Sequence, residues 1–102
     1  MENKILVEVV VPVIEKSYDI YIPANRRIGN TIRLIVKAIN EFTNGAYQLD
    51  TKISLYNSFS GIKYNNNDLI RKTDIRNGSK LILMWYYIFK IGVYYDRRLK
   101  RR

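Results

Sequence analysis

The spacing of the apolar residues changes partway along the chain, and this change limits the folds that the chain can adopt. Over residues 4–22, apolar and polar positions alternate and β-branched residues dominate, which indicates two strands joined by a turn near Glu15. Beyond Asn25, a candidate helix N-cap, the apolar residues recur every three or four positions until residues 44–45, which supply a stop signal. These apolar residues are Ile28, Ile32, Ile35, Ile39 and Phe42. The spacing predicts an amphipathic helix that covers a sheet.

The second half of the chain supplies three more short strands. Residues 53–56 and 62–64 are predicted strands joined by a turn at Gly61, and residues 80–84 are a buried strand after a turn at residues 77–78. The expected order is β-β-α-β-β-β. This order is typical of an α+β domain of the β-grasp type, with a mixed four- to five-stranded sheet and one long helix packed across it. In that arrangement the last strand lies beside the first and parallel to it.

Two residue types that serve many active sites are missing. The chain of 102 residues contains no Cys and no His. Their absence excludes disulfides, zinc sites built from Cys or His, Cys nucleophiles and Ser–His catalytic pairs. The Asp and Glu residues are scattered singly along the sequence. We therefore expect no enzyme activity, and neither catalytic residues nor a metal, a cofactor or a small-molecule substrate.

Five stretches of the sequence resemble the YukD/EsaB family, the ubiquitin-like accessory proteins of bacterial type VII secretion systems. In chain order they read VEVVVP, YDIYIP, IRLIVKAI, LYNSFSGIKY and DIRNGSKLILM. They lie between Lys4 and Met84, which is roughly four-fifths of the chain. The resemblance implies a ubiquitin-like β-grasp domain over residues 1–84 and leaves residues 85–102 as an aromatic and basic C-terminal extension.

The resemblance also implies a function. Proteins of this family are cytosolic and influence the export of small helical WXG-motif proteins without being exported themselves. We therefore expect a non-catalytic accessory or regulatory protein that docks on protein components of a type VII secretion apparatus. The first residues, MENKILVEVVVPVIEK, show no signal-peptide pattern, so we expect a cytoplasmic location, with contact at the inner face of the membrane as an alternative.

The last predicted strand does not lead into the tail of a protein modifier. Ubiquitin is conjugated through a C-terminal Gly-Gly on a slim, extended tail. Here the strand continues into Trp85, Tyr86 and Tyr87, and Gly92 is the only later glycine. Such a segment does not fit the channel of an activating enzyme. We therefore expect a chain that shares the fold of ubiquitin without being conjugated.

The C-terminal extension leaves several roles open. Residues 85–102 contain six Lys and Arg with one acidic residue, whereas residues 1–84 contain 12 basic and eight acidic residues. Binding of nucleic acid or of a membrane surface would rest on this tail, and nucleic acid is the less expected partner. Residues 81–95 are too few for a membrane span and are interrupted by Lys90. As a strand, the tail could pair with a second copy of the chain or with a partner; Gly92 disfavours a helix.

Aromatic and basic side chains are the candidates for partner binding. Ordinary strand packing is the commoner role for the aromatic residues, and a solvated surface is the commoner role for Arg at a helix start. The candidate partner-binding residues are Arg26, Arg27, Arg33, Tyr56, Phe59, Tyr64, Trp85, Tyr87 and Phe89. The candidate electrostatic tail consists of Arg97, Arg98, Lys100, Arg101 and Arg102.

Overall fold

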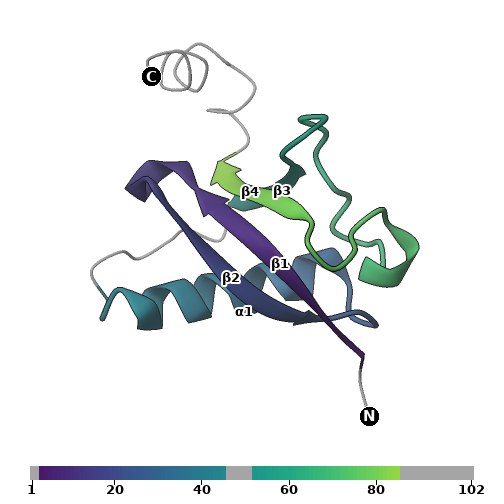
Figure 1. The fold of residues 1–102 in the computed structure, drawn as a ribbon, viewed down its shortest axis with the longest axis horizontal. Coiled ribbons are helices and arrows are strands. Elements are labelled where there is room, and N and C mark those ends of the chain that lie inside the picture. The colour runs from purple at the N-terminus through teal and green to yellow at the C-terminus, as the bar shows by residue number, and fades with distance from the viewer. Residues whose placement is uncertain (1–2, 46–51, 86–102) are drawn as a thin grey trace.

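The computed structural model describes residues 3–45 and 52–85 and places one long helix across a four-stranded sheet (Figure 1). The strands are β1 (Lys4–Val11), β2 (Lys16–Pro23), β3 (Ile53–Asn57) and β4 (Lys80–Trp85), and the helix is α1 (Ile28–Phe42). Single 3-10 turns cover Pro12–Ile14 and Ile70–Lys72. The helix and the sheet form two layers, as the change of apolar spacing predicts.

The sheet is mixed, with the strand order β2-β1-β4-β3. β1 is antiparallel to β2, and β3 is antiparallel to β4, but β1 and β4 are parallel, with Val9 opposite Leu81. Two backbone hydrogen bonds extend this parallel pairing toward the start of β4: Glu8 N donates to Ser79 O (2.9 Å), and Gly78 N donates to Leu6 O (2.8 Å). The predicted α+β class and the position of the last strand beside the first are confirmed.

The start of α1 is capped by a distant segment of backbone. The helix begins at Ile28 with Arg27 as its N-cap, so the expected cap at Asn25 is wrong. No side chain caps this end. Instead Ile28 N donates to Asp68 O (2.8 Å) and Gly29 N donates to Asn66 O (2.9 Å). Amide groups that an isolated helix leaves unpaired are thus satisfied by residues 66–68.

The predicted strand at residues 62–64 does not form among the described residues. Lys63 makes only an isolated bridge with Tyr56. Two backbone hydrogen bonds accompany this bridge: Asn57 N donates to Ile62 O (2.9 Å), and Tyr64 N donates to Leu55 O (2.9 Å). After Tyr64 the chain turns away from the sheet edge to reach the start of α1, so the ladder stops there.

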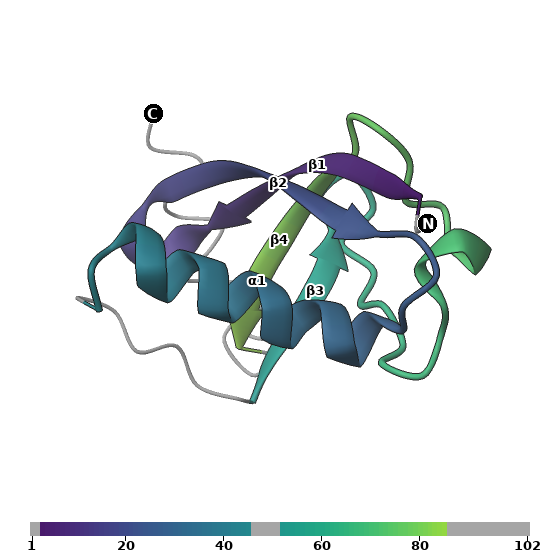
Figure 2. The ribbon, with the colours of Figure 1, turned by 90° about the horizontal axis from the view of Figure 1, so that it is seen from below.

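The core lies between α1 and one face of the sheet, and Figure 2 shows the helix running across the strands. Ile35 and Ile39 of the helix and Leu83 of β4 have no exposed surface. The predicted helical face is therefore buried as expected, except at its last member. Phe42 is 55% exposed, and its ring packs beside Tyr18 of β2, with 5.2 Å between the ring centroids.

The core assignment predicts different effects for two neighbouring substitutions. Ile35→Ala removes a fully buried side chain, and we expect it to lower the free energy of unfolding by about 2–5 kcal/mol. Leu34→Ala changes a side chain that is 43% exposed, and we expect a loss of about 1 kcal/mol or less. Urea unfolding followed by circular dichroism measures both values. Equal losses would show that the helix packs on the sheet through another face.

Candidate docking surfaces

Among the residues whose side chains the structure describes, the most exposed large apolar one is carried by a turn with a fixed backbone. We call residues 57–62 the Phe59 turn. Phe59 is 99% exposed and Ile62 is 66% exposed. The Oδ1 atom of Asn57 accepts hydrogen bonds from Phe59 N (2.7 Å) and Ser60 N (3.0 Å), and Gly61 N donates to Asn57 O (2.8 Å). Because the backbone is already ordered, binding through Phe59 costs little further conformational entropy.

Tyr64 supports the Phe59 turn from behind. Its hydroxyl donates to Asp74 Oδ1 (2.6 Å), and Asp74 Oδ2 accepts from Asn57 Nδ2 (3.1 Å). The side-chain amide of Asn57 therefore makes two kinds of contact. Its oxygen accepts hydrogen bonds from the turn, and its nitrogen donates to the Asp74 carboxylate. Burial, together with the hydrogen bond to the Asp74 carboxylate, holds the pKa of the Tyr64 phenol well above its usual range. Tyr64 is half-buried and also packs against the core beneath α1.

Tyr56 lies on the opposite face of the sheet from α1. With Ile82 and Met84 it forms a small buried cluster, against which Val10 packs. We call this group, with the neighbouring Ser54, the far-face cluster. The exposed fractions are 1% for Tyr56, 2% for Ile82, 3% for Met84 and 7% for Ser54. The structure therefore separates the three predicted aromatic residues whose side chains it describes: Tyr56 is buried on the far face, Tyr64 supports a turn, and Phe59 alone of these three is fully accessible.

The three predicted arginines have different surroundings. The Nη1 atom of Arg27 donates to Asn67 O (2.5 Å), so this side chain joins the backbone cap of α1. The Nη2 atom of Arg33 donates to Asn30 Oδ1 (2.9 Å), one turn earlier on the helix. The backbone O of Arg26 accepts from Ile70 N (2.9 Å). Arg26 and Arg27 thus belong to the junction between the helix start and residues 66–70.

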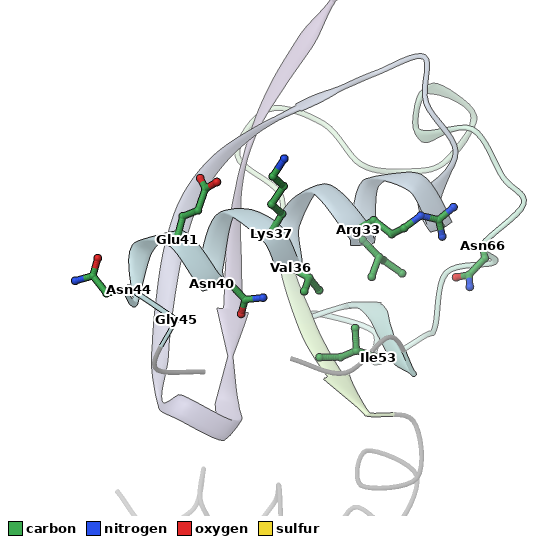
Figure 3. Close-up of a pocket in the computed structure, with 11 residues that line it drawn as sticks. Arg33, Val36, Lys37, Asn40, Glu41, Asn44, Gly45, Ile53 and Asn66 are labelled. Atoms are coloured by element: carbon green, nitrogen blue, oxygen red, sulfur yellow. The ribbon is translucent and has the colours of Figure 1, made fainter. Parts of the chain in front are cut away.

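A groove that the sequence did not predict runs between α1 and β3. Its volume is about 710 Å³. Figure 3 shows Val36 and Asn40 pointing from the helix toward the side of Ile53, with Lys37 and Glu41 directed away. The lining residues come from α1, from the turn at residues 44–45 that follows it, from β3, and from Asn66 in the long connection after β3. No local sequence pattern joins these segments, so the groove could not be predicted from neighbouring residues.

Several predicted residues fall outside what the structure describes. β4 ends at Trp85, whose backbone pairs with Ile53, but the side chain of Trp85 is not described. Tyr87, Phe89 and the electrostatic tail, residues 97–102, lie outside the described residues. Their roles stay predictions.

The described ranges contain neither a cluster of metal-binding residues nor a membrane-spanning helix. Within residues 3–45 and 52–85, Asp and Glu do not gather in groups of three or more that could hold a metal ion. No helix in these ranges has the length and apolar character that crossing a membrane requires.

Comparison with known proteins identifies the fold. No protein-family model and no curated protein sequence matches the chain. Among solved structures, the EccD5 ubiquitin-like domain from Mycobacterium xenopi matches with a TM-score of 0.66 at 17% identity, covering 79% of this chain and 92% of that one. The ubiquitin-like domain of the Mycobacterium tuberculosis type VII secretion protein EccD1 gives 0.62 at 14% identity, covering 80% and 98%.

A third match comes from a larger assembly. A chain of the MycP5-free ESX-5 inner membrane complex gives a TM-score of 0.65 at 12% identity over 93% of this chain, which spans 27% of the length of that larger chain. These likenesses show the ubiquitin-like fold and confirm the predicted fold class. Proteins with this fold include domains of type VII secretion components, the setting that the sequence resemblance indicates.

The Tyr64–Asp74 hydrogen bond predicts a pH dependence of stability. The native state keeps the Tyr64 proton at a pH where the unfolded chain releases it, because the pKa of Tyr64 is raised in the fold. The stability that this group contributes is therefore present below about pH 10, the ordinary value for Tyr, and falls as the pH rises above it. We expect Tyr64→Phe to cost about 1 kcal/mol at neutral pH and to lose less stability than the wild type in alkali.

Urea unfolding at several pH values from neutral to alkaline measures this difference. Tyr21→Phe is the matched control, because Tyr21 is 65% exposed and its stability curve should follow the wild type. Parallel curves for the wild type and Tyr64→Phe would contradict the assigned role of the hydrogen bond.

Proposed function

We propose that this chain is a non-catalytic, ubiquitin-like accessory or regulatory protein of a type VII secretion system. It acts in the cytoplasm by docking on protein components of the secretion apparatus and is not conjugated to other proteins. The observation that carries the proposal is the Phe59 turn, an exposed aromatic residue on a fixed backbone, on a fold shared with domains of type VII secretion proteins.

The fold and its neighbours support the secretion setting. Two of the matching structures are ubiquitin-like domains of EccD proteins, and a third is a chain of an ESX-5 inner membrane complex. The YukD/EsaB resemblance of the sequence points to the same systems. A small domain of this kind would meet its partners where the apparatus faces the cytoplasm.

The shape of the surface supports docking. Aromatic side chains dominate the binding energy of many protein interfaces, because a large apolar area is buried at a small cost in side-chain entropy. Phe59 offers such an area, and Ile62 extends it within the same turn. The hydrogen bonds of Asn57 hold this surface in place before a partner arrives.

The amino-acid sequence that follows β4 supports a role without conjugation. A modifier presents a slim Gly-Gly tail to its activating enzyme. β4 ends with Trp85, and two tyrosines, Tyr86 and Tyr87, come next in the sequence. Bulky aromatic residues directly after the last strand are the opposite of that requirement.

Complementation of a gene deletion tests the proposal. We expect deletion in the host to reduce export of WXG-motif proteins, and the wild-type gene to restore it. Phe59→Ala should fail to restore export, although its stability should stay within about 0.5 kcal/mol of the wild type because the residue is exposed. Immunoblotting of the culture medium measures export, and urea unfolding measures stability.

Tyr21→Ala is the matched control, since Tyr21 is also an exposed aromatic residue but lies on edge strand β2. It should restore export. Unchanged export after deletion would contradict the secretion role. Full restoration by Phe59→Ala would contradict docking through the Phe59 turn.

A further inference from the structure

The outer edge of β2 carries backbone groups that the described residues leave unpaired. β2 lies at one end of the strand order β2-β1-β4-β3. Its Asp19 is opposite Glu8 of β1, but Glu8 N donates to Ser79 O on the β4 side. The pair therefore exchanges no backbone hydrogen bonds, and Asp19 directs its N–H and C=O away from the sheet, as does Ser17 two residues earlier. Nothing in the described part of the chain bonds to these outward groups.

A row of charged side chains crosses the far face of the sheet and ends at this edge. Lys80 of β4 is opposite Glu8 of β1, and Glu8 is opposite Asp19 of β2. The row lies on the far face, because Tyr18 and Ile20, the neighbours of Asp19, pack against the core on the α1 side. Glu8 thus lies between a cation and a second carboxylate, and like charges directly opposite each other are destabilising. Asp19 is exposed, and its carboxylate forms no ion pair or hydrogen bond with the residues that the structure describes.

The α1 side of β2 offers apolar contacts beside the same edge. Tyr18 and Ile20 are only partly buried. Phe42 is 55% exposed and packs beside Tyr18 from the last turn of α1. Four and eight residues earlier, Ala38 and Leu34 continue this side of the helix, and Leu34 is 43% exposed. A strand added to the edge would therefore meet apolar side chains on the α1 side and a carboxylate on the far face.

Charge decides between a second copy of the chain and a different partner. If two copies paired through β2 around Asp19, the two Asp19 carboxylates would come to opposite or neighbouring positions on one face, and like charges in such positions repel. Lys16, the one basic residue of β2, does not compensate, because it lies three positions from Asp19 and so points to the other face. A strand with Lys or Arg opposite Asp19 supplies the charge that the row lacks.

We propose that the β2 edge binds an extended segment of a protein partner by strand addition, with a Lys or Arg of the segment opposite Asp19. In the antiparallel arrangement this basic residue exchanges both backbone hydrogen bonds with Asp19 and places its side chain beside the carboxylate. The residues on either side of it are apolar and contact Tyr18, Ile20 and Phe42. This surface is separate from the Phe59 turn, which follows β3 at the opposite edge of the sheet.

Titration of the isotope-labelled full chain with a synthetic peptide, followed by NMR, tests the proposal. The Lys probe is acetyl-Thr-Val-Lys-Val-Thr-amide, and the matched Glu probe has Glu in place of Lys. We expect the Lys probe to shift the amide signals of residues 16–20 and of Phe42. It should bind at least about fivefold more tightly than the Glu probe, because opposite charges stabilise a cross-strand pair and like charges destabilise it. Equal Kd values for the two probes, or shifts confined to other parts of the chain, would overturn the proposal.

Charge reversal at Asp19 locates the contact. Asp19→Lys should weaken binding of the Lys probe at least about fivefold and strengthen binding of the Glu probe by a similar factor. The variant should fold, because Asp19 is exposed and the substitution removes its like-charge pairing with Glu8. Asp68→Lys is the matched control, since it makes the same change of charge at an exposed residue away from β2, and it should leave the preference for the Lys probe unchanged. Equal effects of the two variants would show that only the overall charge matters and would contradict the proposal.

N-methylation of the probe separates backbone pairing from charge attraction. A methyl group on the backbone nitrogen of the probe's Lys removes the donor that faces β2 and should weaken binding at least about tenfold. A methyl group on the backbone nitrogen of the following Val points away from β2 and should change the Kd less than about twofold. Equal effects of the two methyl groups would overturn strand addition. Signals of residues 16–20 that shift with the concentration of the chain alone would assign the edge to a second copy and would also overturn the proposal.

Discussion

The junction between the start of α1 and residues 66–71 holds the other parts of the molecule in place. Four backbone hydrogen bonds cross it: from Ile28 and Gly29 to residues 68 and 66, and from Ile70 and Arg71 to residues 26 and 24. It gives the helix its missing cap and brings the long connection after β3 back to the helix layer. Gly29 and Asn66 of this junction also line the groove, so the position of that end of the groove follows from it.

Side-chain spacing predicted the parts of the fold that depend on local pattern. The alternation in β1 and β2 and the apolar face of α1 are each read from neighbouring residues, because the period of a strand or helix is local. The helix cap could not be predicted this way. Its acceptors lie about 40 residues away on backbone carbonyls, as Asp68 O does for Ile28 N, and carbonyl groups carry no sequence signal. The predicted strand at residues 62–64 was wrong because of the same distant hydrogen bonds. Residues 66–68, which follow it closely, bond to the start of α1, and Lys63 makes only an isolated bridge with Tyr56.

The residue types of the candidate docking surface could be predicted from the sequence, but which of these side chains are exposed could not. Phe59 was predicted as an aromatic contact residue, and of the predicted aromatic side chains that the structure describes it is the fully exposed one. Tyr56 and Tyr64 have the same chemistry, yet one lies in a buried cluster and the other donates to Asp74. Burial depends on which strand face a residue occupies and on what covers that face. The continuous apolar run of β4, from Leu81 to Met84, did indicate burial on both faces.

The parallel pairing of β1 with β4 has a consequence for synthesis on the ribosome. β1 is made first, but the strand that occupies its inner edge, Lys80–Trp85, is made more than 70 residues later. Until then the part of the sheet that contains β1 is only the β1–β2 hairpin, which is marginal alone, and one edge of β1 is open to other strands. The domain therefore completes its sheet only after nearly all of residues 1–85 have emerged, and a chain that stalls before Lys80 presents an edge that favours aggregation.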